Sequence, residues 1–136
     1  MRNSKIVGLG RYLPEKIVTN DDLAQMMDTS DEWIRERSGI EQRRFFELGK
    51  DTTANMGTSA ARMALENAGL TPDDVDFIVF ATLSPDYDFP GCGVLVQREL
   101  GIKEVGAMDV RTQCTGFVYG VSVADNFIKS GMYDTV

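Results

Sequence analysis

Apolar runs that alternate with helical segments constrain the fold of this chain more than any other feature. Residues 77–81 form a continuous apolar run bounded by Asp76 and Thr82, which is typical of a strand buried on both faces. Residues 106–110 predict a second buried strand, and residues 5–8 predict a short strand. With helices predicted between these runs, the alternation indicates an α/β fold whose parallel or mixed sheet carries helices on its faces.

Capping residues and glycines mark where the helices begin and end. Asn20 is expected to cap a helix that runs to about Met27. Thr29 or Ser30 is expected to cap a second helix that ends before Gly39. Three longer helices are predicted: one opens at Thr52 or Thr53 and ends at Gly69, one runs from about Gly91 to Leu100, and one follows Gly116 and reaches Gly131.

Other stretches are predicted to lack regular structure. Ile17 to Thr19 is predicted to be briefly extended, and the polar residues 40–51 to be irregular. Gly8-x-Gly10 is interpreted as a turn, because the third glycine and the helix of a dinucleotide-binding motif are missing. Residues 135–136 resemble the start of another strand. The pattern leaves open a frayed end or the first part of a longer chain.

Composition and charge narrow the class of protein. The 136 residues include 14 basic and 21 acidic side chains, a net charge of −7, which argues against a nucleic-acid partner. At about 150 residues per domain, residues 1–136 are expected to form one domain or part of one. No run approaches the roughly 18 apolar residues of a membrane helix, and no signal peptide is recognised. Two cysteines are too few for a disulfide scaffold, so a cytoplasmic protein without membrane contact is expected.

Histidine is absent from the sequence. Because histidine is the usual general base near neutral pH, a mechanism must proceed without one or obtain its base from elsewhere. The spacing of metal ligands is also missing, since Cys92 and Cys114 lie far apart and no histidine accompanies them. We therefore expect no metal site.

Cys114 is the candidate nucleophile. It lies between a predicted buried strand and a predicted helix, at the strand end where α/β folds place their ligands. The positive end of a helix dipole favours a thiolate over a thiol, which would activate the sulfur without a histidine in the first step. The pattern alone also allows a buried structural cysteine, and this is the role expected of Cys92. Gly116 and Gly120, four residues apart, would let the helix pack closely against a neighbour.

Trp33 and Arg37 form a second candidate site. They are four residues apart on a predicted helix and therefore share one face. An exposed indole beside a guanidinium could stack on an adenine and pair with a phosphate. The alternative is a tryptophan in the core and an arginine in solvent.

Several motifs together resemble the β-ketoacyl-acyl carrier protein synthase III family of the thiolase superfamily. The resemblance covers essentially the whole chain. It is carried by Gly10-x-Tyr12-Leu13-Pro14, Asp28-Thr29-Ser30-Asp31-Glu32-Trp33-Ile34, Arg37-x-Gly39-Ile40, Phe89-Pro90, Leu100-Gly101-Ile102, Asp109-Val110-x-x-x-Cys114-Thr115-Gly116-Phe117 and Ser122-Val123-Ala124-Asp125. It implies a layered α-β-α-β-α fold, of which this chain covers about the first half.

The resemblance also implies a reaction and roles for residues. The family transfers an acyl group from acyl-CoA to its cysteine, matched by Cys114, then condenses it with malonyl-acyl carrier protein in a decarboxylating Claisen reaction that initiates fatty-acid synthesis. Thr29, Trp33 and Arg37 match the CoA site, and Phe89 matches a residue that lines the acyl pocket of the partner subunit in a homodimer. No cofactor is implied, since the CoA thioester is a substrate.

The catalytic histidine and asparagine of the family have no match in this chain. The resemblance places them in a second half, carried by the same or another chain. Two alternatives stay open: a non-decarboxylating acyl-CoA condensing enzyme of the same superfamily, and a non-catalytic CoA-binding half that requires a partner. Half of such a fold would expose a large apolar face, so we expect the 136 residues alone to aggregate or to need a partner chain.

Overall fold

The structure is a computed structural model that describes residues 2–136, and these form two compact units. The larger unit comprises the described residues up to Tyr12 together with Thr53–Val136, and the smaller unit comprises Leu13–Thr52. The expectation that residues 1–136 form a single portion of one fold stays a prediction.

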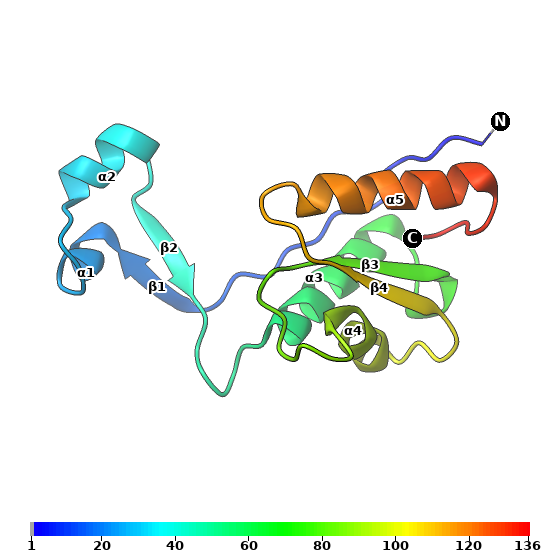
Figure 1. Cartoon of the computed structure of the whole chain (residues 1–136). Helices are drawn as coiled ribbons and strands as arrows, with labels where there is room; N and C mark the ends of the chain where they lie inside the picture. Colours follow the sequence, from blue (N-terminus) through cyan, green and yellow to red (C-terminus); the bar gives the residue numbers. More distant parts are fainter. Residues whose placement is uncertain (1) are drawn as a thin grey trace. The chain divides into compact units, whose positions relative to one another are not determined.

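A parallel strand pair covered by helices forms the larger unit (Figure 1). Strand β3 (Phe77–Ala81) pairs in parallel with β4 (Gly106–Val110). Helix α5 (Gly116–Ser130) covers one face, and helices α3 (Thr53–Ala68) and α4 (Cys92–Leu100) cover the other. A short 3-10 turn, η1 (Pro72–Asp74), precedes β3. The α-β-α arrangement of helices and strands confirms the predicted α/β class.

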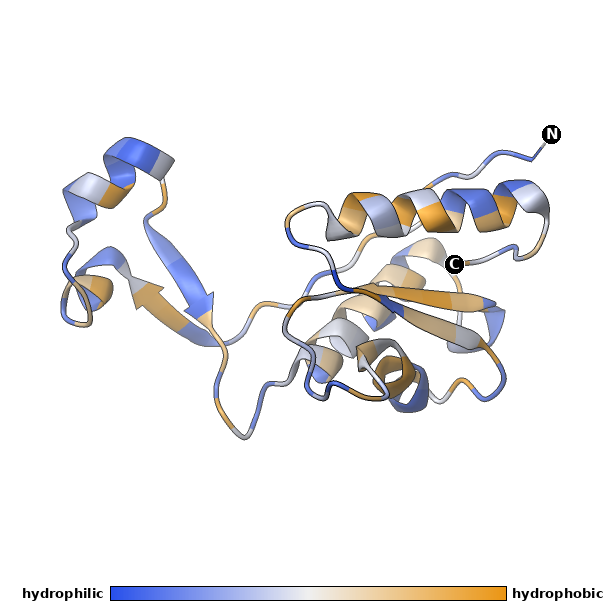
Figure 2. Cartoon of the chain, viewed as in Figure 1, coloured by the Kyte–Doolittle hydropathy of each residue, from blue (hydrophilic) through white to orange (hydrophobic). Residues whose placement is uncertain are grey.

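The core of the larger unit lies between α3, α4 and one face of the sheet. Its buried side chains are Ala54, Leu95, Val96, Leu100 and Ile102. Colouring by hydropathy shows β3 as strongly apolar and β4 as paler (Figure 2). Helices lie on both faces of the strand pair, but the residues of β3 and β4 are only half-buried or exposed, so the predicted full burial is wrong for the described residues. The reason is that each strand has only one paired neighbour among them, which leaves an open edge.

The predicted strand over residues 5–8 is wrong. No segment within residues 2–136 pairs with it, and a strand exists only through hydrogen bonds to a neighbour. Gly8 and Gly10 instead lie against α3, and Asn67 donates a 2.8 Å hydrogen bond to the carbonyl of Leu9. Neither glycine has a positive φ. The two glycines therefore allow the backbone to approach α3 closely, and they do not form the predicted turn.

We therefore expect Gly10→Ala to destabilise the chain. A Cβ on Gly10 would clash with the backbone oxygen of Ala60 and lie 2.6 Å from the backbone nitrogen of Ala64, neither of which can rotate away. The expected loss in the free energy of unfolding is about 2 kcal/mol. Urea denaturation measures it, with Leu9→Ala as the control because Leu9 is exposed. Equal losses for both variants would contradict the close-approach argument.

The smaller unit is a two-stranded antiparallel ribbon with two short helices. Strand β1 (Lys16–Thr19) pairs with β2 (Gln42–Phe45), and helices α1 (Asn20–Ala24) and α2 (Asp31–Ser38) lie between them in sequence. The prediction that residues 40–51 are irregular is wrong for residues 42–45, which form β2, and is confirmed for residues 46–51. Strand β2 is mostly polar because its ribbon is largely exposed, so it lacks the apolar alternation that sequence patterns detect.

Local capping residues determine the ends of the two helices. Thr19, not Asn20, is the N-cap of α1, in a reciprocal capping box with Asp22. This helix ends at Ala24 rather than near Met27. Ser30 caps α2 as predicted, and Gly39 ends it with a φ of 69°.

Within residues 2–136 no helix is long and apolar enough to cross a membrane.

Helix α5 carries many exposed apolar side chains. They are Phe117, Val118, Tyr119 and Val121. Exposed apolar surface of this kind supports the expectation that the 136 residues alone aggregate or need a partner chain. A sizing column with light scattering measures it, and a monodisperse monomer would contradict it.

Candidate active site

Cys114 lies in the loop that joins β4 to α5. The loop follows the carboxyl end of β4, and α5 begins two residues after the cysteine, with Thr115 as its N-cap. The N–H of Gly116 donates a 3.0 Å hydrogen bond to the carbonyl of Gln113, which closes a tight turn around Cys114. The thiol is exposed, so the alternative of a buried structural cysteine does not hold here. Its position at a strand end and before a helix is as predicted.

An open groove runs beside the Cys114 loop, with a volume of about 490 Å³. Its lining comes from the end of β3, the loop before α5 and the first turns of α5. Gln113 and Gly116, on either side of Cys114, both contribute to it, together with Phe117. The groove therefore adjoins the loop, although Cys114 itself is not among its lining residues.

Two glycines bring α5 close to the sheet. Gly116 and Gly120 are buried, and a Cβ on each would lie 3.4 Å from the side chains of Ala81 and Val79. The prediction that these glycines allow close helix packing is confirmed. The start of α5, and with it the Cys114 loop, is held against the end of β3.

Two half-buried carboxylates that sequence reasoning missed hold the segment before α4. Asp109 accepts hydrogen bonds from the N–H groups of Cys92 and Gly93, at 2.7 and 2.8 Å, and thereby caps α4 from the neighbouring strand. Asp86 caps α3 in the same way, through the N–H groups of Thr53 and Ala54 at 2.7 and 2.8 Å. The sequence did contain a signal for the Asp109 cap. A single aspartate inside the otherwise apolar run 106–110 needs hydrogen-bond donors for its carboxylate.

Cys92 has the environment of a structural cysteine. Its side chain is fully buried, and its Sγ accepts a 3.4 Å hydrogen bond from the N–H of Asp86. Burial raises the pKa of the Cys92 thiol, which keeps it protonated and unreactive. This contrasts with the exposed Cys114.

Phe89 lies in the loop between β3 and α4 and is 89% exposed. Arg111 at the end of β4 donates a 2.6 Å hydrogen bond to the backbone carbonyl of Asp88, next to Phe89. The loop is therefore anchored to the strand that leads to Cys114, and the phenyl ring projects outward. Its predicted role in a partner's acyl pocket stays a prediction.

The smaller unit contains the second candidate site. Trp33 is 54% exposed, and the Arg37 guanidinium carbon lies 4.6 Å from the centre of its ring. The predicted shared face is confirmed, and the alternative of a core tryptophan is wrong. Thr29 lies half-buried directly before the α2 cap. Trp33, Arg37 and Thr29 belong to one unit, and Cys114 and Phe89 belong to the other.

Asp31 in the first turn of α2 gives this region a pH dependence. Hydrogen bonds from Arg35 and then Asn20 hold the pKa of Asp31 below its ordinary value of 3.8. The ionised Asp31 therefore contributes its full stabilisation above its ordinary pKa of 3.8. This stabilisation is lost as the pH falls through the lowered pKa of the folded state. We expect Trp33 fluorescence to be constant from neutral pH to about pH 5 and to change below pH 4. Asp31→Asn should remove most of this transition, and an unchanged transition would contradict the assignment.

Among the described residues, no cluster of three or more histidine, cysteine, aspartate or glutamate side chains could hold a metal ion.

Solved structures of known proteins share the fold of this chain. A crystal structure of 3-oxoacyl-[acyl-carrier-protein] synthase III from Aquifex aeolicus is 47% identical, with a TM-score of 0.89 over 93% of this chain and 41% of that one. A priming β-ketosynthase of the R1128 polyketide biosynthetic pathway is 35% identical, with a TM-score of 0.91 over 96% of this chain and 39% of that one. The fold is therefore that of the thiolase-like ketosynthases.

Sequence comparison narrows this class to one family. The β-ketoacyl-[acyl-carrier-protein] synthase III of Ehrlichia canis is 51% identical over all of this chain, which corresponds to 42% of that protein. The profile of 3-oxoacyl-[acyl-carrier-protein] synthase III matches residues 108–136, a span that contains Cys114. The chain belongs to the β-ketoacyl-[acyl-carrier-protein] synthase III family and spans less than half the length of the curated relatives it matches.

Proposed function

We propose that this chain is the N-terminal portion of a β-ketoacyl-acyl carrier protein synthase III and that Cys114 is its acyl acceptor. The observation that carries the proposal is an exposed thiol at the carboxyl end of β4, directly before α5 and inside the matched span. The other cysteine is buried, which leaves Cys114 as the accessible thiol among the described residues.

The first half-reaction is a thioester exchange. The Cys114 thiolate attacks the acyl-CoA carbonyl, a new C–S bond forms, and the C–S bond to CoA breaks. The departing CoA thiolate takes up the proton that Cys114 lost. The first turn of α5 supports this step, because its backbone N–H groups favour an anion.

The second half-reaction is a decarboxylating Claisen condensation. Malonyl-acyl carrier protein loses CO₂, and the resulting carbanion attacks the acyl thioester on Cys114. The β-ketoacyl-carrier protein leaves, and the Cys114 thiolate is restored. Because the sequence contains no histidine, the groups that assist decarboxylation come from a second half, in the same or another chain.

Binding of acyl-CoA is assigned to the smaller unit. Trp33 offers an exposed ring for the adenine, Arg37 offers a cation for a phosphate, and Thr29 directly precedes the N-cap of the same helix. Phe89 lines the acyl pocket of the second subunit in a cytoplasmic homodimer. This proposal requires no resident cofactor.

Acetylation of Cys114 tests the proposal. The protein that contains this chain is incubated with acetyl-CoA, digested and analysed by mass spectrometry. The expected result is the mass gain of one acetyl group on the Cys114 peptide and none on the Cys92 peptide. No gain, or equal gain on both peptides, would refute the acyl-acceptor role.

The absent histidine favours one alternative, a non-catalytic CoA-binding half. A non-decarboxylating condensation of two acyl-CoA molecules is the alternative within the superfamily. Assays with malonyl-carrier protein, malonyl-CoA and acetyl-CoA alone separate them. Condensation that requires malonyl-carrier protein supports the proposed reaction, and CoA binding without acylation supports the non-catalytic alternative.

A further inference from the structure

A buried asparagine connects the elements that surround the Trp33 site. Asn20, the first residue of α1, is only 1% exposed, although most asparagines lie at protein surfaces. A buried amide is stable only when its polar atoms are hydrogen-bonded, so its partners indicate what it holds in place.

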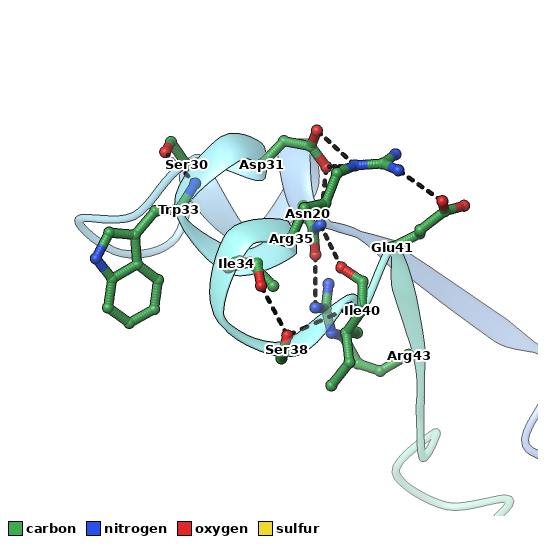
Figure 3. Close-up of polar contacts among 10 residues, drawn as sticks. All are labelled: Asn20, Ser30, Asp31, Trp33, Ile34, Arg35, Ser38, Ile40, Glu41 and Arg43. Atoms are coloured by element: carbon green, nitrogen blue, oxygen red, sulfur yellow. Dashed lines mark hydrogen bonds and ion pairs between the residues drawn. The ribbon is translucent and has the colours of Figure 1, made fainter.

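The Asn20 side chain has three partners from three different segments (Figure 3). Its Nδ2 donates to Oδ1 of Asp31 and to the carbonyl of Ile40, both at 2.8 Å. Its Oδ1 accepts from Arg43, whose Nη2 lies 2.6 Å away. Arg43 also donates to the carbonyl of Val18 at 3.2 Å.

These contacts attach both ends of α2 to the strand ribbon. Asp31 is in the first turn of α2, and Ile40 follows its last turn. Arg35 extends the network along the helix, since its Nε bonds Asp31 at 2.7 Å and its Nη1 bonds Glu41 at 2.6 Å. One amide therefore links the first turn of α2 to the residue that follows its C-cap.

Trp33 depends on this arrangement. Its N–H donates to the hydroxyl of Ser30 at 3.1 Å, which fixes its backbone in the same first turn as Asp31. Its indole, in contrast, is half exposed and points away from Asn20 and Arg43 (Figure 3). A half-exposed ring is a better stacking surface when its backbone is held rigidly, because less freedom is lost on binding.

We propose that Asn20 is a positioning residue for the nucleotide end of acyl-CoA, acting by fixing the first turn of α2 beneath Trp33. This inference rests on the proposed function for the identity of the ligand. The positioning itself rests on the hydrogen bonds of Asn20.

The experiment uses Trp33 as a reporter, because it is the sole tryptophan of the chain. CoA and adenosine 3′,5′-bisphosphate are titrated into the whole chain, and quenching of Trp33 fluorescence gives the dissociation constants. Asn20→Ala and Arg43→Met are expected to raise both constants on the order of tenfold. Arg44→Met is the matched control. Arg44 lies on the same strand but bonds the carbonyls of Pro14 and Glu15, outside the Asn20 network, so its constants should not change.

A second readout needs no ligand. Trp33 fluorescence anisotropy should fall in Asn20→Ala while far-UV circular dichroism shows that the chain remains folded. Asn20→Asp places a carboxylate against that of Asp31 and should also weaken binding. Combining it with Asp31→Asn restores an amide–carboxylate pair and should recover part of the loss.

The outcomes separate the two proposals. If the unaltered chain binds CoA and Asn20→Ala changes neither binding nor anisotropy, the positioning role is overturned and the proposed function stands. If the unaltered chain does not bind CoA, the proposed function fails and the nucleotide part of the inference fails with it. A fall in anisotropy in Asn20→Ala would then still support control of Trp33 by Asn20.

Discussion

Replacing Cys114 by alanine is expected to abolish acyl transfer from acyl-CoA. The rate should fall on the order of a thousandfold or more, because alanine has no atom that can form the thioester. Release of free CoA, followed with a thiol reagent, measures the rate, and intact-protein mass spectrometry measures the acyl-enzyme. The exposed Cys114 loop should tolerate the smaller side chain with little change in stability.

Cys92→Ala is the control for this result. Cys92 is buried, and burial raises the pKa of its thiol, so it should contribute nothing to acyl transfer. Its replacement leaves a small cavity and should lower the free energy of unfolding by about 1 kcal/mol while acylation continues. Acylation that persists in Cys114→Ala, or that is lost in Cys92→Ala at full folding, would contradict the assignment of the nucleophile.

Asp109→Ala is expected to produce the largest loss of stability among the substitutions considered. The carboxylate bonds two N–H groups at the start of α4, and its removal leaves both without that partner. Loss of a cap that carries a charge should lower the free energy of unfolding by about 3 kcal/mol. Urea denaturation followed by circular dichroism measures the difference.

Two variants define the specificity of this effect. Asp109→Asn keeps one acceptor oxygen and should lose less than Asp109→Ala. Asp88→Ala should be nearly neutral, because the Asp88 side chain is fully exposed and its contact with Arg111 is long, at 3.4 Å. A neutral Asp109→Ala would show that α4 does not depend on capping from β4.

The Asp109 cap also explains how the larger unit arranges its candidate residues. Asp109 and Arg111 are two residues apart on the strand end that leads to Cys114. Asp109 holds the start of α4, and Arg111 holds Asp88, so the two anchors flank Phe89 on either side. The Phe89 loop is therefore tied to the same strand as the cysteine.

The helices and central strands could be predicted because their signals are local. Strands 77–81 and 106–110 and the long helices are encoded by neighbouring residues through apolar runs, caps and terminal glycines. Strand β2 could not be predicted, because a polar, exposed ribbon has no apolar alternation. The strand predicted over residues 5–8 failed for the opposite reason, since an apolar run becomes a strand only beside a paired neighbour.

By itself, the sequence determined the α/β class, the family resemblance, the position of Cys114 at the end of a strand, and the shared face of Trp33 and Arg37. The tertiary structure alone decided that Cys114 is exposed and Cys92 buried, that Asn20 joins both ends of α2, and that Asp109 caps a helix on another element. Burial and hydrogen bonding between residues far apart in the chain depend on the packed fold, which local patterns of apolar and capping residues do not encode.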